Sequence, residues 1–553
     1  MPESRRLDGH PVRHPRTGAS STMRHASSLG SQLLLIAAFA FTSACGGGDN
    51  GGASDPGTGG RGGSSAKGGS GGSSSGGVTG SGGGGVASGG AGGSARDSGP
   101  DGDPDASDPD ASGGDDTGTP AAGGKNPVLF GSHKFMYPAG AIRPSGTQAE
   151  VDAAVAAAYD RWIARFLKTG CGGYYIDGGS GTGFTGDTVS FSEAHGYGML
   201  VTVIMAGHDP KAQERYDGLL KVYRGLPSIN NPGLMAAGFT KDCKGSQNLM
   251  PKMGEGPSIP DSATDGDLDA AFSMLMADRQ WGSAGPTNYL AEAKKSIAAI
   301  KAHEINAETS FILLGDWADV KADYYPKNYG PASPFGKAYK NPAKHLAFYY
   351  GTRSSDFMLD HFKAFGAASG DAPYWGKVVD AHYGLIAKIQ GQFSAATGLL
   401  PGFIVAKTAD MAMPAPANYL EDVSDGEWDY NACRDPWRIA TDWIATGEPR
   451  AKLAVTKMNE WVKKTTGSDP AKLVDGYKLD GSTKGHAATD ATFIAPFGVS
   501  AIVDASNQAW LDKVWAHIKG GDCTPSPPDS NCYFADSIGL ISMIAMSGNW
   551  WQP

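Results

Sequence analysis

From about residue 126 to the C-terminus, the chain shows the pattern of successive amphipathic helices, with apolar residues recurring every three or four positions. Thr147 and Glu150 form a capping-box sequence, which predicts a helix that runs to about Lys168 and stops at Gly170. Further helices are expected to begin near the following residues: Ser192, Asp209, Asp267, Asn288, Ser355, Tyr374, Cys433, Glu448, Phe493, Asn507 and Ala535.

The predicted helices come in pairs joined by short turns rich in Gly, Asp or Pro, which is the pattern of stacked antiparallel helical hairpins. About twelve helices can form six hairpins and close into an (α/α)6 barrel, so we expect an all-α fold with a long groove made by helix ends and loops. Strands are expected only as short pieces around residues 173–177 and 402–406. A superhelical α-solenoid is the competing architecture, but the sequence contains no repeat of about 34 to 47 residues.

Two segments precede this helical domain, residues 126–553. Residues 46–125 contain 32 glycines and no aromatic residue; such a composition cannot bury enough apolar surface to fold, so we expect a disordered, flexible tether. Residues 1–45 include an apolar run at 33–41 that is typical of a signal peptide, with Met23 a better start than Met1. Cys45 follows small residues and resembles a bacterial lipobox. A lipid anchor at Cys45 and plain secretion are both consistent with this pattern, and each predicts export.

Besides the lipobox cysteine, the sequence contains five cysteines. Cys523 and Cys532 flank a turn-rich loop that brings its ends together, so they are predicted to form a disulfide. Cys171 with Cys243 is a second candidate pair. Cys433 is expected to be a buried small residue rather than a nucleophile, because no base is spaced to activate it.

The formal net charge of −10 over 553 residues is only mildly acidic. It argues against nucleic acid as a partner, because a phosphate backbone calls for a basic face, whereas a neutral or cationic polymer is compatible. No Cys-x-x-Cys pair or group of histidines indicates zinc, and no motif indicates a nucleotide. We therefore expect no metal or cofactor, and a monomer.

A first acidic motif, S-E-A-H-G-Y-G-M-L, begins at Ser192 and opens an apolar helix. Glu193 in the first turn is stabilised by the helix dipole, and that role alone would explain it. Gly196 and Gly198 disfavour the helix by about 1 kcal/mol each, and Tyr197 lies between them. A helix start with this composition indicates a surface shaped for a ligand.

A second acidic motif, A-T-D-G-D-L-D, places three aspartates at alternate positions: Asp265, Asp267 and Asp269. The alternation is similar to a calcium loop, but Ala270 and Met276 stand where such a loop needs Gly and Glu. Asp267 and Asp269 are interpreted as first-turn carboxylates, while Asp265 precedes the helix and can point into a groove. Two carboxylates at helix starts suggest acid/base chemistry on a neutral substrate.

Both motifs resemble those of glycoside hydrolase family 8: A-T-D-G-D-L-D-A-A-F-S-M-L-M-A-D-R-Q-W is similar to the family signature, and S-E-A-H-G-Y-G-M-L to the segment of its general acid. A third segment, D-Y-N-A-C-R-D-P-W-R at residues 429–438, is similar to the family's Y-D-A-x-R-x-P-W-R. The resemblance implies an inverting endo-glycanase on an (α/α)6 barrel that acts on β-1,4-linked polysaccharides. It implies Glu193 as the general acid and Asp265 as the residue that binds and distorts the sugar before the scissile bond.

The chain departs from that pattern at Asn431, which stands where most members have the aspartate base; an amide cannot accept the proton of water. The resemblance to a subfamily of chitosanases and lichenase-like enzymes implies that a loop glutamate takes over, and Glu421 in P-A-P-A-N-Y-L-E matches best. Pro414 and Pro416 stiffen the approach to Glu421, which favours it over Asp425 next to a glycine. A solvated acidic loop without a catalytic role is the alternative.

Arg434 matches the family's arginine beside the catalytic water, although an ion pair with Asp429 or Asp435 would also explain it. Further candidates for sugar binding are Tyr197, Trp281, Trp317, Trp437, Asn431 and, in the family-like segment at residues 352–358, Asp356. The sequence therefore predicts an exported family 8 endo-glycanase, with chitosan as the first substrate and β-1,3-1,4-glucan, cellulose or xylan as alternatives. From other classes, a glycan-binding protein that lost its base and a solenoid interaction protein stay open.

Overall fold

The computed structural model describes residues 124, 126–179, 187–246, 260–319, 348–488, 490–520, 523 and 532–553. The predicted signal segment, Cys45 and the tether of residues 46–125 lie outside this part, apart from Gly124. None of the helices in the described residues is both long enough and apolar enough to cross a membrane.

The described part contains twelve α-helices, and their bounds are as follows: α1 Gln148–Phe166, α2 Ser192–Ile204, α3 Ala212–Gly225, α5 Thr264–Trp281, α6 Tyr289–His303, α9 Leu359–Ser369, α10 Ala372–Gln392, α11 Asp435–Thr446, α12 Pro449–Thr466, α13 Ala491–Ala501, α14 Gln508–Ile518 and α15 Tyr533–Ser547. Short 3-10 helices are η1 Asp316–Ala318, η2 Ser354–Asp356, η3 Ala409–Met411, η4 Ala432–Arg434, η5 Pro470–Lys472 and η6 Ala505–Asn507. The capping box of Thr147 and Glu150 is present at α1.

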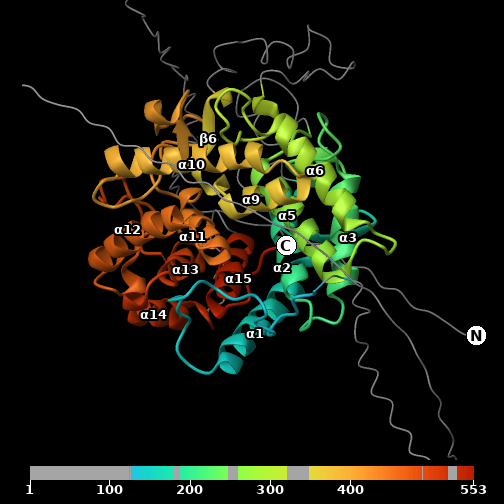
Figure 1. The fold of residues 1–553 in the computed structure, drawn as a ribbon, viewed down its shortest axis with the longest axis horizontal. Coiled ribbons are helices and arrows are strands. Elements are labelled where there is room, and N and C mark those ends of the chain that lie inside the picture. Colours follow the sequence, from blue (N-terminus) through green and yellow to red (C-terminus); the bar gives the residue numbers. More distant parts are fainter. Residues whose placement is uncertain are drawn as a thin grey trace, which may run out of the picture. The chain divides into compact units, whose positions relative to one another are not determined.

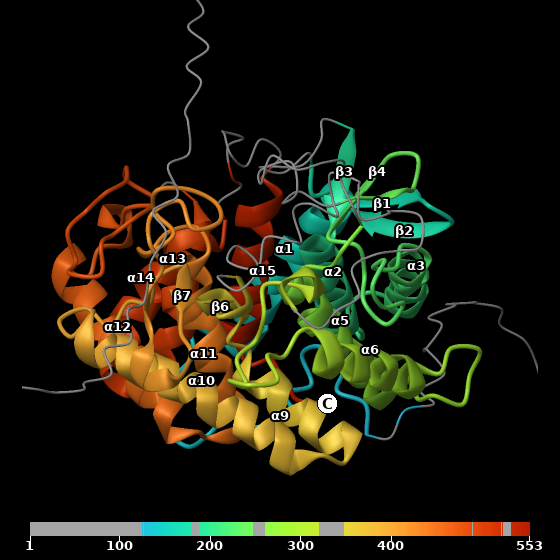
Figure 2. The same cartoon turned by 90° about the horizontal axis from the view of Figure 1, so that it is seen from above.

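Six of these helices form a closed inner ring, in which each contacts the next in the order α2, α5, α9, α11, α13 and α15, and α15 returns to α2. Each inner helix packs against one outer partner: α3, α6, α10, α12, α14 and α1 in the same order. Figures 1 and 2 show the outer helices around the inner ones. The fold is an (α/α)6 barrel, as expected, with one addition: the sixth hairpin joins the first helix of the domain, α1, to the last, α15.

The inner helices are buried on nearly all faces, which explains their sequences. In α2 and α13 almost every residue is buried, whereas the outer helix α12 buries only one face and carries a C-terminal Lys463 and Lys464 in its last turn. A helix with apolar residues all round is stable only inside a core, and an amphipathic one covers it. This division between inner and outer helices leaves the N-terminal ends of α2 and α5 side by side.

Strands are more numerous than predicted, although all are short. Two of them, β2 Gly173–Ile176 and β7 Phe403–Val405, match the expected pieces. The others are β1 Leu167–Gly170, β3 Thr188–Phe191, β4 Gly238–Thr240, β5 Gly245–Ser246, β6 Gly351–Arg353 and β8 Met413–Pro414, and they form antiparallel sheets β1-β2, β3-β4-β5 and β6-β7-β8. Helix α1 ends at Phe166, two residues before the approximate end expected and well before Gly170, because Leu167 pairs with Ile176 in the β1-β2 sheet.

Two disulfides lie in the described part. Cys523 is joined to Cys532, and Cys171 to Cys243, which are the two pairs that the sequence suggested. Cys433 is a free, buried cysteine, as expected. Its thiol donates to the Tyr430 carbonyl, and burial raises its pKa well above the usual value, so it is not poised as a nucleophile.

Candidate active site

The two acidic motifs meet at one end of the barrel, because α2 and α5 are neighbours and both begin there. Glu193 lies in the first turn of α2 and Asp265 in the first turn of α5. The Asp265 side chain is 3% exposed, whereas that of Glu193 is 14% exposed. Glu193 can therefore reach a ligand, while Asp265 lies just beneath it.

Arg434 connects these carboxylates to the start of α11. Its Nη1 donates to Glu193 Oε2 at 2.6 Å and to Asp265 Oδ2 at 3.1 Å. Nη1 also lies 3.2 Å from the Tyr197 hydroxyl, and Nη2 donates to Ser355 Oγ at 2.9 Å. A planar guanidinium with several fixed donors can bind these four partners on three elements (α2, α5 and η2) at once, which a lysine cannot do.

The surroundings of the two carboxyl groups shift their pKa values in opposite directions. Burial raises the pKa of Glu193 to about 7, the Arg434 charge opposes this, and the Asp265 charge adds to it. Burial would also raise the pKa of Asp265, but Arg353 and Arg434 outweigh it and hold that pKa below its usual value. A protonated carboxyl beside an ionised one is the arrangement of an acid with an electrostatic partner.

Three residues of the cluster were missed in the sequence. Arg353 Nη1 lies 3.4 Å from Asp265 Oδ2, Ser355 accepts from Arg434, and the Tyr533 hydroxyl donates to Glu193 Oε1 at 3.1 Å. Arg353 and Ser355 belong to the family-like segment from which only Asp356 was taken. Tyr533 directly follows Cys532 at the start of α15, and no sequence signal placed it beside Glu193, 340 residues away.

Asp356 belongs to the same cluster, as the sequence suggested. It is fully buried at the end of η2, and its Oδ2 lies 4.0 Å from Arg353 Nε. Burial raises the pKa of Asp356 to about 7, against the opposing charge of Arg353. Its burial makes Asp356 a support for Arg353 rather than a surface that meets the sugar directly.

Glu421 and Asn431 are brought together as a pair. Asn431 Nδ2 donates to Glu421 Oε2 at 2.8 Å, and Arg434 Nη2 donates to Asn431 Oδ1 at 3.3 Å. Glu421 is exposed in its loop, and Asn431 is half-buried. A continuous series of polar contacts thus runs from Glu193 through Arg434 and Asn431 to Glu421.

Asp425 is not the flexible alternative base that its glycine neighbour suggested. Its side chain is buried, and its two oxygens accept the backbone amides of residues 420, 421 and 422 at 2.6 to 3.0 Å. A carboxylate that satisfies three backbone donors shapes the loop and has little capacity left for a water proton. Asp425 therefore fixes the turn that carries Glu421.

The remaining aspartates of the second motif point elsewhere, so they do not form a calcium loop with Asp265. Asp267 Oδ1 accepts from the Tyr223 hydroxyl and from the Met235 amide. Asp269 forms a bidentate pair with Arg438 and accepts from His361 at 3.0 Å. Both are fully buried and connect elements of the barrel. Asp267 lies in the first turn of α5, as expected, but so does Asp265, which was wrongly expected to precede the helix. Among the described residues, no group of three or more potential ligands is arranged to hold a metal ion.

The aromatic platforms predicted from the sequence are buried. Trp281 lies at the far end of α5 and packs against Tyr216 and Tyr289, about 24 Å along the helix from Asp265. The prediction that Trp281 binds sugar was wrong, because the helix carries it away from the site. Tyr197 is also fully buried, so it supports Arg434 from below instead of stacking on a sugar.

Trp317 and Trp437 are buried in the same way. Tyr430, which the sequence reasoning did not choose, is 37% exposed and directly precedes Asn431. Its ring lies 4.9 Å from that of Phe493 and 6.5 Å from that of Phe534. Tyr430 therefore offers an exposed aromatic ring on the residue that precedes Asn431.

The glycines of the first motif serve helix packing. A Cβ on Gly196 would come within 2.9 Å of the Asp269 Cβ and the Gly266 carbonyl oxygen, and one on Gly198 within 2.4 Å of Ile176. The expectation that these glycines shape a ligand surface was wrong, since they let α2 approach α5 and β2. They influence the site only by setting where Glu193 stands.

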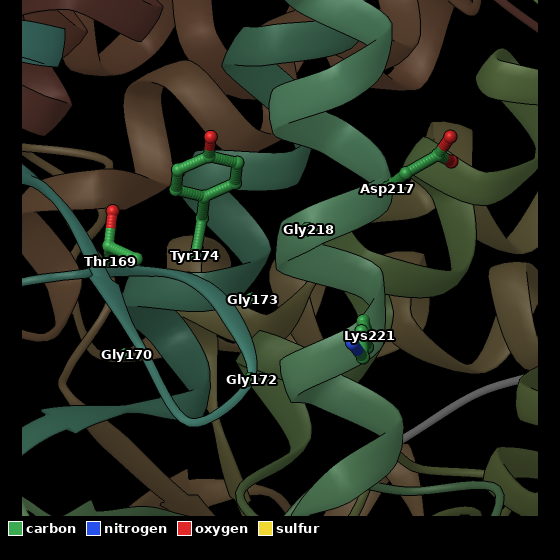
Figure 3. A pocket seen from close by; sticks show the side chains of 8 residues that line it. All are labelled: Thr169, Gly170, Gly172, Gly173, Tyr174, Asp217, Gly218 and Lys221. Atoms are coloured by element: carbon green, nitrogen blue, oxygen red, sulfur yellow. The ribbon is translucent and has the colours of Figure 1, made fainter.

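A hollow of 430 Å³ lies apart from this cluster, between the β1-β2 turn and α3 (Figure 3). Its lining consists of Thr169, Gly170, Gly172, Gly173, Tyr174, Asp217, Gly218 and Lys221. None of these residues contacts Glu193, Asp265 or Arg434 in the described interactions, and the hollow lacks a carboxylate pair. Among the described residues, the carboxylates of the two acidic motifs that meet at the barrel end lie around Arg434 and outside this hollow.

Comparison with known proteins shows which family this chain belongs to. Residues 149–335 match the family described as Glycosyl hydrolases family 8. The chain is 44% identical over 417 residues to a protein named Beta-glucanase from Niallia circulans, covering 75% of this chain and 89% of that protein. The chain belongs to glycosyl hydrolase family 8. It is therefore a glycoside hydrolase.

Two further comparisons agree with this. A protein named Endoglucanase from Bacillus sp. (strain KSM-330) is 35% identical over 424 residues, which cover 75% of this chain and 80% of that protein. The apo structure of a β-1,3-1,4-glucanase from Paenibacillus sp. X4 superposes with a TM-score of 0.65 at 41% identity and covers 77% of this chain and 99% of that one. The likeness extends over nearly the whole barrel of that glucanase.

Proposed function

We propose that this family 8 hydrolase is an inverting endo-β-glucanase that cleaves β-1,4 linkages in β-1,3-1,4-glucan and related glucans. The observation that carries the proposal is the polar series Glu193–Arg434–Asn431–Glu421. At one end stands a carboxyl whose pKa burial raises to about 7, and at the other an exposed carboxylate. An inverting site needs these two groups about 6.5 to 9.5 Å apart, with a water between sugar and base.

In the proposed reaction, Glu193 donates its proton to the glycosidic oxygen as the bond from that oxygen to the anomeric carbon breaks. A water attacks the anomeric carbon from the opposite face, and Glu421 takes the proton that the water loses. Asp265 stays ionised between Arg353 and Arg434, and the 3% of its side chain that is exposed accepts a hydrogen bond from a hydroxyl group of the sugar before the scissile bond. Each step needs only groups on this chain, water and the glycan.

The balance of charge at the site favours a neutral glucan over chitosan. Arg353 and Arg434 are buried against Asp265, and the pKa values of Glu193 and Asp356 near 7 reduce the negative charge further. The cluster therefore offers little surplus negative charge to attract the ammonium groups of glucosamine. The names of the relatives at 44% and 41% identity support the same choice. Chitosan, first in the sequence-based expectation, is the second candidate.

We also propose that the protein is exported and meets its polysaccharide outside the cytoplasm. The two disulfides, Cys171–Cys243 and Cys523–Cys532, support this, because such bonds persist in oxidising compartments. Lipidation of Cys45 stays a prediction. Metabolic labelling with a fatty acid, compared between the parent and Cys45→Ser, tests it; absence of label in the parent would leave plain secretion.

The test of activity is release of new reducing ends from β-1,3-1,4-glucan, carboxymethyl-cellulose, xylan and chitosan by the full chain. We expect β-1,3-1,4-glucan to be cleaved fastest. Glu193→Gln and Glu421→Gln should each lower kcat by about 10²- to 10⁴-fold, as expected for loss of a positioned acid or base. Proton NMR of the first product should show the anomer opposite to that of the substrate.

Other outcomes would point to other functions. Faster cleavage of chitosan would restore the original substrate expectation. Tight glycan binding without new reducing ends, unaffected by Glu421→Gln, would instead indicate a glycan-binding protein that has lost its base.

A further inference from the structure

The Asn431 side chain lies between a hydrogen-bond donor, Arg434, and a hydrogen-bond acceptor, Glu421. Its side-chain oxygen accepts from Arg434 Nη2 at 3.3 Å, and its backbone oxygen accepts from Arg434 Nε at 3.3 Å. Arginine has donors only, so the amide oxygen must face it. The amide NH₂ is then directed to Glu421 Oε2, 2.8 Å away. The neighbours of Asn431 therefore fix which way its amide points.

We propose that Asn431 is the positioning residue for Glu421, and that an amide is required there because the base is a loop glutamate. This rests on the proposed role of Glu421 as base. The Asn431 hydrogen bond fixes one carboxylate oxygen, Oε2, and leaves the other free to accept a proton from water. Through Arg434, the same amide ties the loop to the turn of α2 that carries Glu193.

The loop needs such a tie because Glu421 is exposed and its backbone is held only locally. Asp425 accepts the backbone amides of residues 420–422, and Phe403 in β7 donates to the Asp425 carbonyl at 2.8 Å. These contacts fix the turn but do not restrain the several rotatable bonds of the Glu421 side chain. The charge of Arg353 attracts the Glu421 carboxylate but does not fix its orientation. Asn431 supplies the missing restraint on the carboxylate itself.

An aspartate at position 431 would have the same shape as Asn431 and the opposite effect. It would place a second carboxylate oxygen about 3 Å from Glu421, where like charges oppose ionisation and raise the pKa of the pair. Arg434 would also be drawn toward the new charge and away from Glu193. The amide at 431 and the glutamate at 421 thus suit each other, and changing one alone should disturb both ends of the site.

The experiment compares the full-length parent with N431A, N431D, E421Q and the control D422N on β-1,3-1,4-glucan, measuring kcat, KM, the pH dependence of kcat/KM and the melting temperature. The control removes one exposed loop carboxylate, whose contact is the Ser424 amide. N431A should lower kcat about 10- to 100-fold and change KM less than about threefold. It should also move the acidic limb of kcat/KM to higher pH, because Glu421 loses a hydrogen bond that stabilises its ionised form. N431D should move that limb further, and D422N should match the parent.

The outcomes separate this inference from the proposed function. If E421Q keeps the kcat of the parent, Glu421 is not the base, and the proposed function in this form fails together with the inference. If E421Q loses activity while N431A and N431D keep the parental kcat and pH profile, only the positioning role is overturned. A lowered melting temperature in N431A with an unchanged acidic limb would likewise assign Asn431 a purely structural role and overturn the inference.

Discussion

Gly266 of α5 lies directly against the backbone of Ser192, the first residue of α2. A Cβ on Gly266 would come within 2.3 Å of the Ser192 carbonyl carbon and 2.6 Å of the Glu193 amide nitrogen. A Cβ cannot sit this close to backbone atoms unless the backbone shifts, so glycine lets the two helix starts approach so closely. This contact sets the spacing between Glu193 and Asp265, and it depends on the absence of one side chain.

We expect Gly266→Ala to lower the free energy of unfolding by about 1 to 3 kcal/mol, as overpacking does, and to reduce kcat by displacing Glu193. Gly376→Ala in α10 is the matched control, because Gly376 has nothing within 4 Å of its added Cβ. There the same substitution should stabilise the protein by about 0.4 to 1 kcal/mol. Urea unfolding and kcat on β-1,3-1,4-glucan measure both; equal effects of the two variants would contradict the packing argument.

The pH profile should report the raised pKa of Glu193. Because the acid must be protonated and burial raises its pKa to about 7, kcat/KM should fall roughly tenfold per pH unit above about pH 7. Asp265→Asn removes a negative charge that helps to raise this pKa, so its alkaline limb should move to lower pH although its rate is also lower. If the alkaline limb of kcat/KM in Asp265→Asn lies at the same pH as in the parent, a group other than Glu193 controls that limb.

The substitution Arg434→Lys should strongly reduce both activity and stability, although it keeps the positive charge. A lysine cannot reach Glu193, Asp265, Ser355 and Asn431 together, and buried carboxylates lose their partner. We expect kcat to fall at least about 100-fold and the free energy of unfolding by about 3 to 5 kcal/mol, the usual effect of breaking a buried ion pair. Activity measurements and thermal unfolding test this; a variant with near-parental kcat would exclude the bridging role of Arg434.

Substitutions at Tyr430 and at Trp281 should differ in their effect on glycan binding. Tyr430→Ala removes the exposed ring beside Asn431 and should raise KM by roughly 10-fold, since stacking a ring on an apolar face contributes about 0.5 to 1.5 kcal/mol beyond the buried area. Trp281→Phe, at the distant end of α5, should leave KM unchanged. Kinetics on β-glucan oligosaccharides distinguish the two, and a KM effect confined to Trp281→Phe would reverse this assignment.

A buried group of carboxyls beneath the site should make stability depend on pH. Burial raises the pKa of Asp267 to about 8 and those of Glu304 and Asp316 above their usual values. An unfolded carboxyl titrates near about pH 4, so the folded state binds more protons between about pH 4 and 8 and the free energy of unfolding falls as pH rises through that window.

Asp267→Asn keeps an acceptor for Tyr223 and Met235 but removes one titrating group. We expect its free energy of unfolding to fall less steeply between pH 5 and 9 than that of the parent. Glu460→Gln on α12 replaces an exposed carboxylate and serves as the control, with a slope equal to that of the parent. Urea titrations across this pH range give the slopes; identical slopes for parent and Asp267→Asn would refute the prediction.

The sequence by itself determined the helices, their pairing and the chemistry at their starts. Periodicity and caps located the twelve helices, because a helix buries a stripe that recurs every 3.6 residues whatever it packs against. The motifs around Glu193, Asp265 and Arg434 were local in sequence, and so could be read directly. The loop base Glu421 was chosen from its segment, and its role stays a prediction.

The tertiary structure decided which of these residues meet. Tyr533 reaches Glu193 because α15 closes the ring onto α2, and Trp281 leaves the site because a straight helix carries it to the other end of the barrel. The β1-β2 hairpin ended α1 early, since pairing between Leu167 and Ile176 overrode helical propensity. Such contacts join residues far apart in the chain, and the free energy that selects them comes from packing and charge pairing across the barrel, which no local pattern contains.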